Sequence, residues 1–173
     1  MPFLPLLGGD IKMNKTLVIS AVVSLGLAFA MTSDAQEGPT PAQRAAGATA
    51  DRQAVFKLLR HNIGPIVGMA RGMMDFDAAI AERNARRIAA LAPMIPELLA
   101  AMDTREFDVS TAALPVIWDN MDEFADKAQN LVDAANTFAD IAAGGDQAAT
   151  IAGVRGLGGA CGNCHDSFRV DTD

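Results

Sequence analysis

The sequence lacks tyrosine and holds only two cysteines and two histidines among its 173 residues. A structural zinc site needs four Cys or His ligands, and His61 lies about a hundred residues from the cysteines, so the sequence argues against such a site. β-Branched residues are few, while alanine is abundant. This composition favours helices. The absence of a strand-rich stretch also argues against the βαβ setting of a thioredoxin-like redox motif.

Basic residues are the minority among the charged ones, and the formal net charge is −7. An acidic chain of this kind is not expected to bind nucleic acid. The charge favours solubility and would steer a basic partner. Only one apolar run approaches the length of a membrane span, so we expect no membrane contact once that run is removed.

That run lies near the N-terminus and predicts a secretory signal peptide. Lys12 and Lys15 precede the apolar residues 16–30, and the small residues Ser33-Asp34-Ala35 place cleavage before Gln36. Residues 1–35 would then be removed, although cleavage after Ala30 and translation from Met13 remain alternatives. An uncleaved anchor is less favoured, because the run is shorter than the ~20 residues of a spanning helix. We therefore expect export to the periplasm.

The most specific motif is Cys161-Gly162-Asn163-Cys164-His165. The pattern C-x-x-C-H is the attachment sequence of a c-type haem. On a helix, spacings of three and four residues bring Cys161, Cys164 and His165 to one face. The sequence thus predicts one haem c, bound covalently through Cys161 and Cys164, with His165 as an iron ligand. Dithiol redox chemistry or another metal site is the competing interpretation.

Apolar periodicity predicts an all-α fold, an antiparallel four-helix bundle of one domain. We expect residues 36–48 to form a mobile lead and residues 49–173 to form the bundle. The second helix should break near Ala92, because Pro93 and Pro96 interrupt it. The predicted helices cover about residues 49–74, 75–102, 115–143 and 146–169, with a loop at 103–113.

The last of these helices is expected to carry the haem inside the bundle. Gly158, Cys161, His165 and Phe168 continue an apolar seam that begins at Ile151. Several glycines make this helix intrinsically weak, at up to ~1 kcal/mol each relative to alanine. We interpret them as positions where the backbone approaches the porphyrin. The glycines concerned are Gly153, Gly156, Gly158 and Gly159.

Together these features resemble the class II c-type cytochromes, specifically the cytochrome c′ family. Arg52-Gln53 is similar to an Arg-Gln pair of the family, and residues 115–118 (PVIW) resemble its Pro-x-Ile-Trp segment. The C-terminal placement of C-x-x-C-H, followed by Asp166 and Arg169, distinguishes this class from ordinary c-type cytochromes. The resemblance covers about residues 49–171.

The resemblance implies roles for further residues. In six-coordinate members a methionine lies four positions after the arginine and ligates the iron, whereas here that position is Phe56. The implied iron is therefore five-coordinate and high-spin, and it binds nitric oxide and carbon monoxide. Arg52 and Gln53 would donate to a haem propionate, or otherwise occupy a solvated helix face. Arg169 would flank the proximal side or stabilise the helix end.

Other function classes stay open. A six-coordinate, low-spin electron-transfer cytochrome would need a sixth ligand such as Met102 or Met121. Peroxidase chemistry needs a distal acid/base, which Phe56 does not supply, so we do not expect an enzyme. A thiol oxidoreductase is the non-haem alternative. The resemblance further suggests a homodimer through the first two helices and a redox partner that the sequence does not identify.

Overall fold

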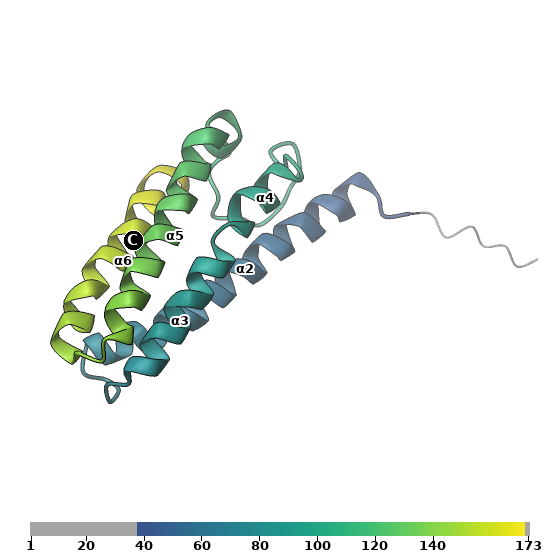
Figure 1. The fold of residues 1–173 in the computed structure, drawn as a ribbon. Coiled ribbons are helices and arrows are strands. Elements are labelled where there is room, and N and C mark those ends of the chain that lie inside the picture. Colours follow the sequence, from purple (N-terminus) through teal and green to yellow (C-terminus); the bar gives the residue numbers. More distant parts are fainter. Residues whose placement is uncertain (1–37, 172–173) are drawn as a thin grey trace, which may run out of the picture. The chain divides into compact units, whose positions relative to one another are not determined.

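The computed structural model describes residues 38–171 and confirms an all-α four-helix bundle (Figure 1). The expected signal peptide, residues 1–35, lies outside the described residues. Helices α3 and α4 follow one another and together form one leg of the bundle. The elements in chain order are α2 (Pro41–Ala70), α3 (Ala78–Leu91), α4 (Met94–Ala100), the 3₁₀ helix η1 (Pro115–Asp119), α5 (Met121–Ala143) and α6 (Gln147–Phe168).

Helix α2 begins eight residues earlier than the sequence predicted, which corrects the expected lead over residues 36–48. Thr40 and Gln43 form a capping box, in which the Gln43 N–H donates to Thr40 Oγ1 (3.2 Å) and the Thr40 N–H donates to Gln43 Oε1 (2.8 Å). Pro41 occupies the first helical turn, where no N–H is needed. Residues 41–48 are therefore helical. Pro65 does not end the helix, which continues to Ala70.

The second helical segment of the bundle is interrupted between Leu91 and Met94, as the prolines predicted. The Ile80 N–H donates to the Asp77 carboxylate (2.9 Å) and caps α3, which ends at Leu91, while α4 starts after Pro93. The third predicted helix differs at its start. Residues 115–119 form the 3₁₀ helix η1, and the α-helix begins only at Met121.

A tight turn joins α5 to α6 as the sequence predicted. Gly145 has φ +76°, a conformation that side chains disfavour, and it follows the last residues of α5. The Ala149 N–H then donates to Asp146 Oδ1 (2.8 Å), so Asp146 is the N-cap of α6.

The core is built on α5, which packs closely against both α3 and α6, while α2 packs against α3. Alanines fully buried on α3 and α5, including Ala85 and Ala135, allow the backbones to approach closely. Contact between α2 and α6 is slight. Where they meet, Ile66 and Met69 of α2 line a small apolar cavity together with Val154 of α6. Toward the N-terminal half of α2 the two helices diverge (Figure 1).

The end of α6 is fixed to the segment before η1. The Leu114 N–H donates to the Phe168 carbonyl (2.9 Å), and the Val170 N–H donates to the Ala112 carbonyl (2.8 Å). Phe168 also packs edge-to-face on Phe124 of α5, with ring centroids 5.2 Å apart. The C-terminal turn of α6 is thus held from two sides.

Among the helices of residues 38–171, none combines the length and the apolar character needed to cross a membrane.

Candidate functional site

The motif Cys161-Gly162-Asn163-Cys164-His165 lies in the last three turns of α6, in helical conformation throughout. Both thiols are free, and Cys161, Cys164 and His165 are all partly buried. The cysteines pack against the edge of the core, whose nearest fully buried member on α6 is Leu157. Among the protein side chains Gly158 is exposed. The motif therefore lies at the border of the side-chain core.

The flank of α6 beside the motif is free of side chains. A Cβ added at Gly158 or Gly162, which lie beside His165 on the helix, would meet no atom within 4 Å, so a flat group can approach the backbone there. Gly153 differs, because a Cβ there would approach Phe138 to 3.3 Å. Its role is close packing of α6 on α5, which corrects the porphyrin role expected for it.

The protonation of the motif follows from its burial. Burial raises the pKa of the Cys161 thiol, and burial also raises that of Cys164, against the opposing charge of Lys127. Burial lowers the pKa of His165, and the nearby Arg169 charge lowers it further, while Asp166 opposes them. A neutral imidazole with a free ring-nitrogen lone pair is thereby favoured, which is the form that ligates iron. Two thiols and one imidazole on a bare helix flank fit a covalently bound haem.

Arg52 lies buried on α2, with 6% of its surface exposed. Its Nε donates to the Leu98 carbonyl (3.1 Å), its Nη1 donates to Thr104 Oγ1 (2.9 Å), and its Nη2 donates to the Met102 carbonyl. These acceptors are all neutral. Burial lowers the pKa of Arg52, and the Asp103 charge partly offsets this. Since a guanidinium carries five N–H donors, two remain for another acceptor, and a buried cation favours an anionic one.

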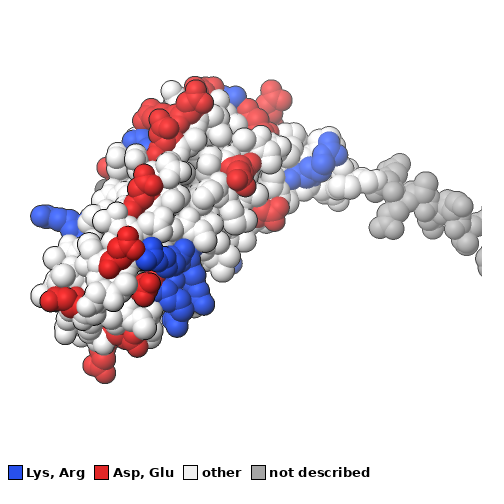
Figure 2. Space-filling view, in the orientation of Figure 1, with Lys and Arg blue, Asp and Glu red and all other residues white. Residues whose placement is uncertain are grey.

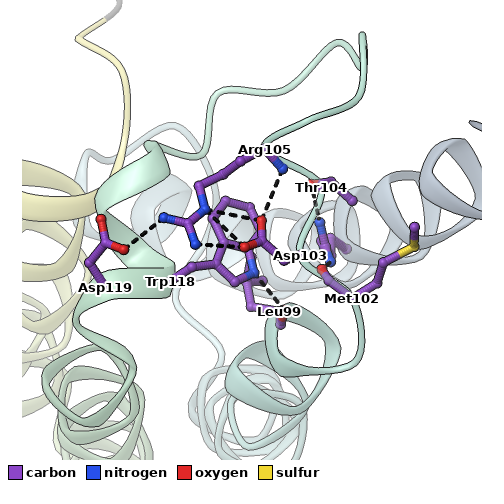
Figure 3. A network of polar contacts seen from close by, with 8 residues as sticks. Leu99, Met102, Asp103, Thr104, Arg105, Trp118 and Asp119 are labelled. Atoms are coloured by element: carbon purple, nitrogen blue, oxygen red, sulfur yellow. Dashed lines mark hydrogen bonds and ion pairs between the residues drawn. The ribbon is translucent and has the colours of Figure 1, made fainter.

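A second arginine, Arg105, lies beside the indole of Trp118 (Figure 3), which Arg52 also contacts. The guanidinium carbons of Arg52 and Arg105 lie 5.5 Å and 5.9 Å from the Trp118 ring centroid. The Trp118 indole N–H donates to the Leu99 carbonyl at 3.1 Å. Trp118 is thus partly buried, and its ring packs against Arg52.

The charge of Arg105 is balanced by two carboxylates. Its Nη2 lies 2.7 Å from Asp103 Oδ2, and its Nη1 lies 2.7 Å from Asp119 Oδ1. These bonds tie the 103–113 segment to η1. They join residues of opposite sign that are separated in the chain, and no local pattern in the sequence indicated which would pair. Sequence reasoning therefore missed this network.

The remaining predicted site residues, Gln53, Phe56 and Arg169, differ in their exposure and in the contacts they make. The Gln53 amide donates to the Ser110 carbonyl (2.9 Å), so it holds the 103–113 segment. Phe56 is 40% exposed and lines a shallow depression with Arg52 and Leu98. Arg169 is exposed, and its backbone pairs with Ala113.

The methionines in and after α2, and those at positions 102 and 121, differ in burial. Met69 is buried in the core, whereas Met73 and Met74 are exposed in the turn after α2, which ends at Ala70. Met102 and Met121 are both partly buried.

Comparison with known proteins identifies the family. A family model described as "Cytochrome C'" matches residues 47–169. Cytochrome c′ of Cereibacter sphaeroides is 38% identical over 69% of this chain and 80% of its own length. Cytochrome c-554 of the same organism is 36% identical over 68% and 77%. Among solved structures, cytochrome c′ from Rhodopseudomonas palustris superposes with a TM-score of 0.66 at 30% identity, covering 73% of this chain and 98% of its own.

The C-x-x-C-H motif on α6, the four-helix bundle and the similarity to these proteins all indicate the same family. The chain belongs to the cytochrome c′ family, and its cofactor is a covalently attached haem c.

Proposed function

We propose that this chain holds its haem through Cys161 and Cys164, uses His165 as the only protein ligand of the iron, and binds nitric oxide and carbon monoxide. The observation that carries the proposal is Phe56 on α2, because its side chain offers no lone pair at the position that the family uses for a sixth ligand. When bound, the haem supplies an iron with one open coordination position.

The apolar side chains around Phe56 select among small ligands. Val55 and Ile95 line the same depression, and none of these side chains donates a hydrogen bond. Neutral diatomic gases enter such a surface without a desolvation penalty. Dioxygen is disfavoured, since its polar adduct needs a distal donor. A solved cytochrome c′ mutant from Alcaligenes xylosoxidans, 24% identical to this chain, is a nitric oxide complex.

Arg52 and Gln53 are proposed to position the haem by one propionate. The two N–H groups of Arg52 that remain after its three protein bonds match the paired oxygens of a carboxylate. The bond from Gln53 to Ser110 leaves its amide oxygen and one N–H unused. Arg169 keeps positive charge beside His165, which favours the neutral imidazole.

The alternatives have less support. Thiol oxidoreductases use cysteines with lowered pKa values, whereas burial raises the pKa of both thiols here. A peroxidase needs a distal acid/base, and Phe56 supplies none. Electron transfer remains compatible with a five-coordinate iron, so we include it beside gas binding.

We propose export to the periplasm, in keeping with the predicted signal peptide. The face in Figure 2 carries acidic side chains at several places, a compact basic group and further basic side chains at its edges, so a redox partner with complementary charges is favoured. A solved cytochrome c′ with 28% identity shows ligand-controlled dimer dissociation. We extend a homodimer to this chain as a proposal, which sedimentation velocity tests directly.

The experiment for the proposed function combines mass spectrometry with a gas titration. The exported protein should carry the mass of one haem on the peptide containing Cys161 and Cys164. The ferrous protein should then change its optical spectrum when carbon monoxide or nitric oxide is added. A peptide without haem, or a haem spectrum indifferent to both gases, would contradict the proposal.

A further inference from the structure

Lys127 of α5 is tied to the haem-attachment motif of α6. Its Nζ donates to Asn163 Oδ1 (3.0 Å), and Asn163 lies between the two cysteines. Only 14% of the Lys127 side chain is exposed, which is low for a residue type that is seldom buried. The ammonium group is therefore fixed against the turn that carries the thiols.

The only carboxylate within ion-pair distance of Lys127 among the described residues is Glu123, one turn earlier on α5. Its Oε1 lies 3.5 Å from Nζ, and its side chain is 59% exposed. Because the Glu123 carboxylate is exposed, solvent screens it, and it offsets the charge of Lys127 only in part. Most of the positive charge of Lys127 is thus left to act on its surroundings.

A fixed charge near a haem changes its reduction potential. The ferrous state carries one positive charge less than the ferric state, so a nearby cation stabilises the ferrous state and a nearby anion destabilises it. The partly buried position of Lys127 increases this effect, because screening is weaker there than at an exposed surface.

We propose that Lys127 raises the reduction potential of the haem, and that Glu123 limits how far it does so. Lys127 is thus a positioning and tuning residue, which acts through the attachment turn without touching the iron. The inference rests on the proposed haem attachment at Cys161 and Cys164.

The test is a spectroelectrochemical titration of the haem-loaded protein and its variants at one pH and ionic strength. Lys127→Gln should shift the one-electron equilibrium toward the ferric state by roughly threefold to tenfold, where tenfold corresponds to 59 mV. Glu123→Gln should shift it the opposite way by a smaller factor, and Lys127→Arg should leave it near the wild-type value.

A matched control is Arg86→Gln, which removes a cation on α3 that pairs with Asp140, near the opposite end of α5. It should leave the potential unchanged. Shifts of the same sign in Lys127→Gln and Glu123→Gln, or none in either, would show a merely structural contact and overturn the inference. Glu123→Gln keeps the test valid if Lys127→Gln folds poorly, since Glu123 is exposed. Wild-type protein without covalent haem would instead overturn the proposed function, and this inference with it.

Discussion

At the scale of single residues, the proposed coordination of the iron depends on Phe56. It lies one turn after Arg52 on α2, and it lines the same depression. A thioether at this position would offer a lone pair where the phenyl ring offers none. The difference between gas binding and a closed, six-coordinate iron is therefore expected to depend on this side chain.

Phe56→Met should convert the protein to a low-spin, six-coordinate form. If the methionine occupies the iron nine-tenths of the time, the apparent Kd for carbon monoxide rises about tenfold, because only the open fraction binds. Phe56→Leu is the matched control and should keep the high-spin spectrum. Equal gas affinity in both variants would refute the role given to Phe56.

Arg52 has a structural role that is separable from haem binding. Arg52→Met would remove its three hydrogen bonds and leave the Leu98 and Met102 carbonyls without their donor. We expect a loss of about 2–4 kcal/mol in the free energy of unfolding, measured with urea. Arg44→Met, at an exposed bond to Pro39, should cost less than about 0.5 kcal/mol. A similar small cost for both would contradict the packing role of Arg52.

At the scale of elements, the 103–113 segment is held by charge. Hydrogen bonds from the Arg105 side chain and backbone lower the pKa of Asp103 below its usual 3.8. A carboxyl whose pKa is depressed in the folded state stabilises the fold above its unfolded pKa. This stabilisation is lost as the pH falls below 3.8 toward the folded pKa.

Asp103→Asn should therefore flatten the acid limb of the stability curve. Thermal melts from pH 5 down to pH 2 should show a shallower fall in Tm for this variant than for the wild type. Asp108→Asn, in the same segment, serves as the control. An acid limb as steep in Asp103→Asn as in the wild type would show that the Arg105 contact contributes nothing to folding.

Local signals predicted the end of α5 and both ends of α6, and missed the start of α2 and of α5. The predicted end at residue 143 and the predicted helix 146–169 agree with α5 and α6 to within one residue. The start of α2 was missed although Thr40, Pro41 and Gln43 carry a capping signature, because the prolines suggested a loop. The stacking of Arg52 and Arg105 on Trp118 joins three distant segments, so no periodicity in the sequence encodes it.

At the scale of the whole molecule, haem and bundle are expected to stabilise one another. Helix α6 carries several glycines whose cost is not offset by side-chain contacts, since a Cβ at Gly156, Gly158 or Gly159 would touch nothing. Contact between α2 and α6 is slight, so the bundle is closed mainly through α3 and α5. A haem between α2 and α6 would supply the missing apolar contacts.

The double variant Cys161→Ala/Cys164→Ala, which cannot attach haem covalently, should therefore lose most of its cooperative unfolding. We expect reduced helix content by circular dichroism and fast amide exchange over α6, with α3 and α5 better protected. A haem-free protein that is fully helical and melts in one sharp transition would contradict this mutual dependence.

The spin state of the purified protein, recorded without added gas, tests the central claim most directly. Optical and electron paramagnetic resonance spectra should show a high-spin, five-coordinate iron in both oxidation states, with His165 as its only protein ligand. A low-spin, six-coordinate spectrum would mean that another side chain, such as Met102 or Met121, occupies the position beside Phe56. The account of an open, gas-binding site would then be wrong, and dedicated electron transfer would replace it.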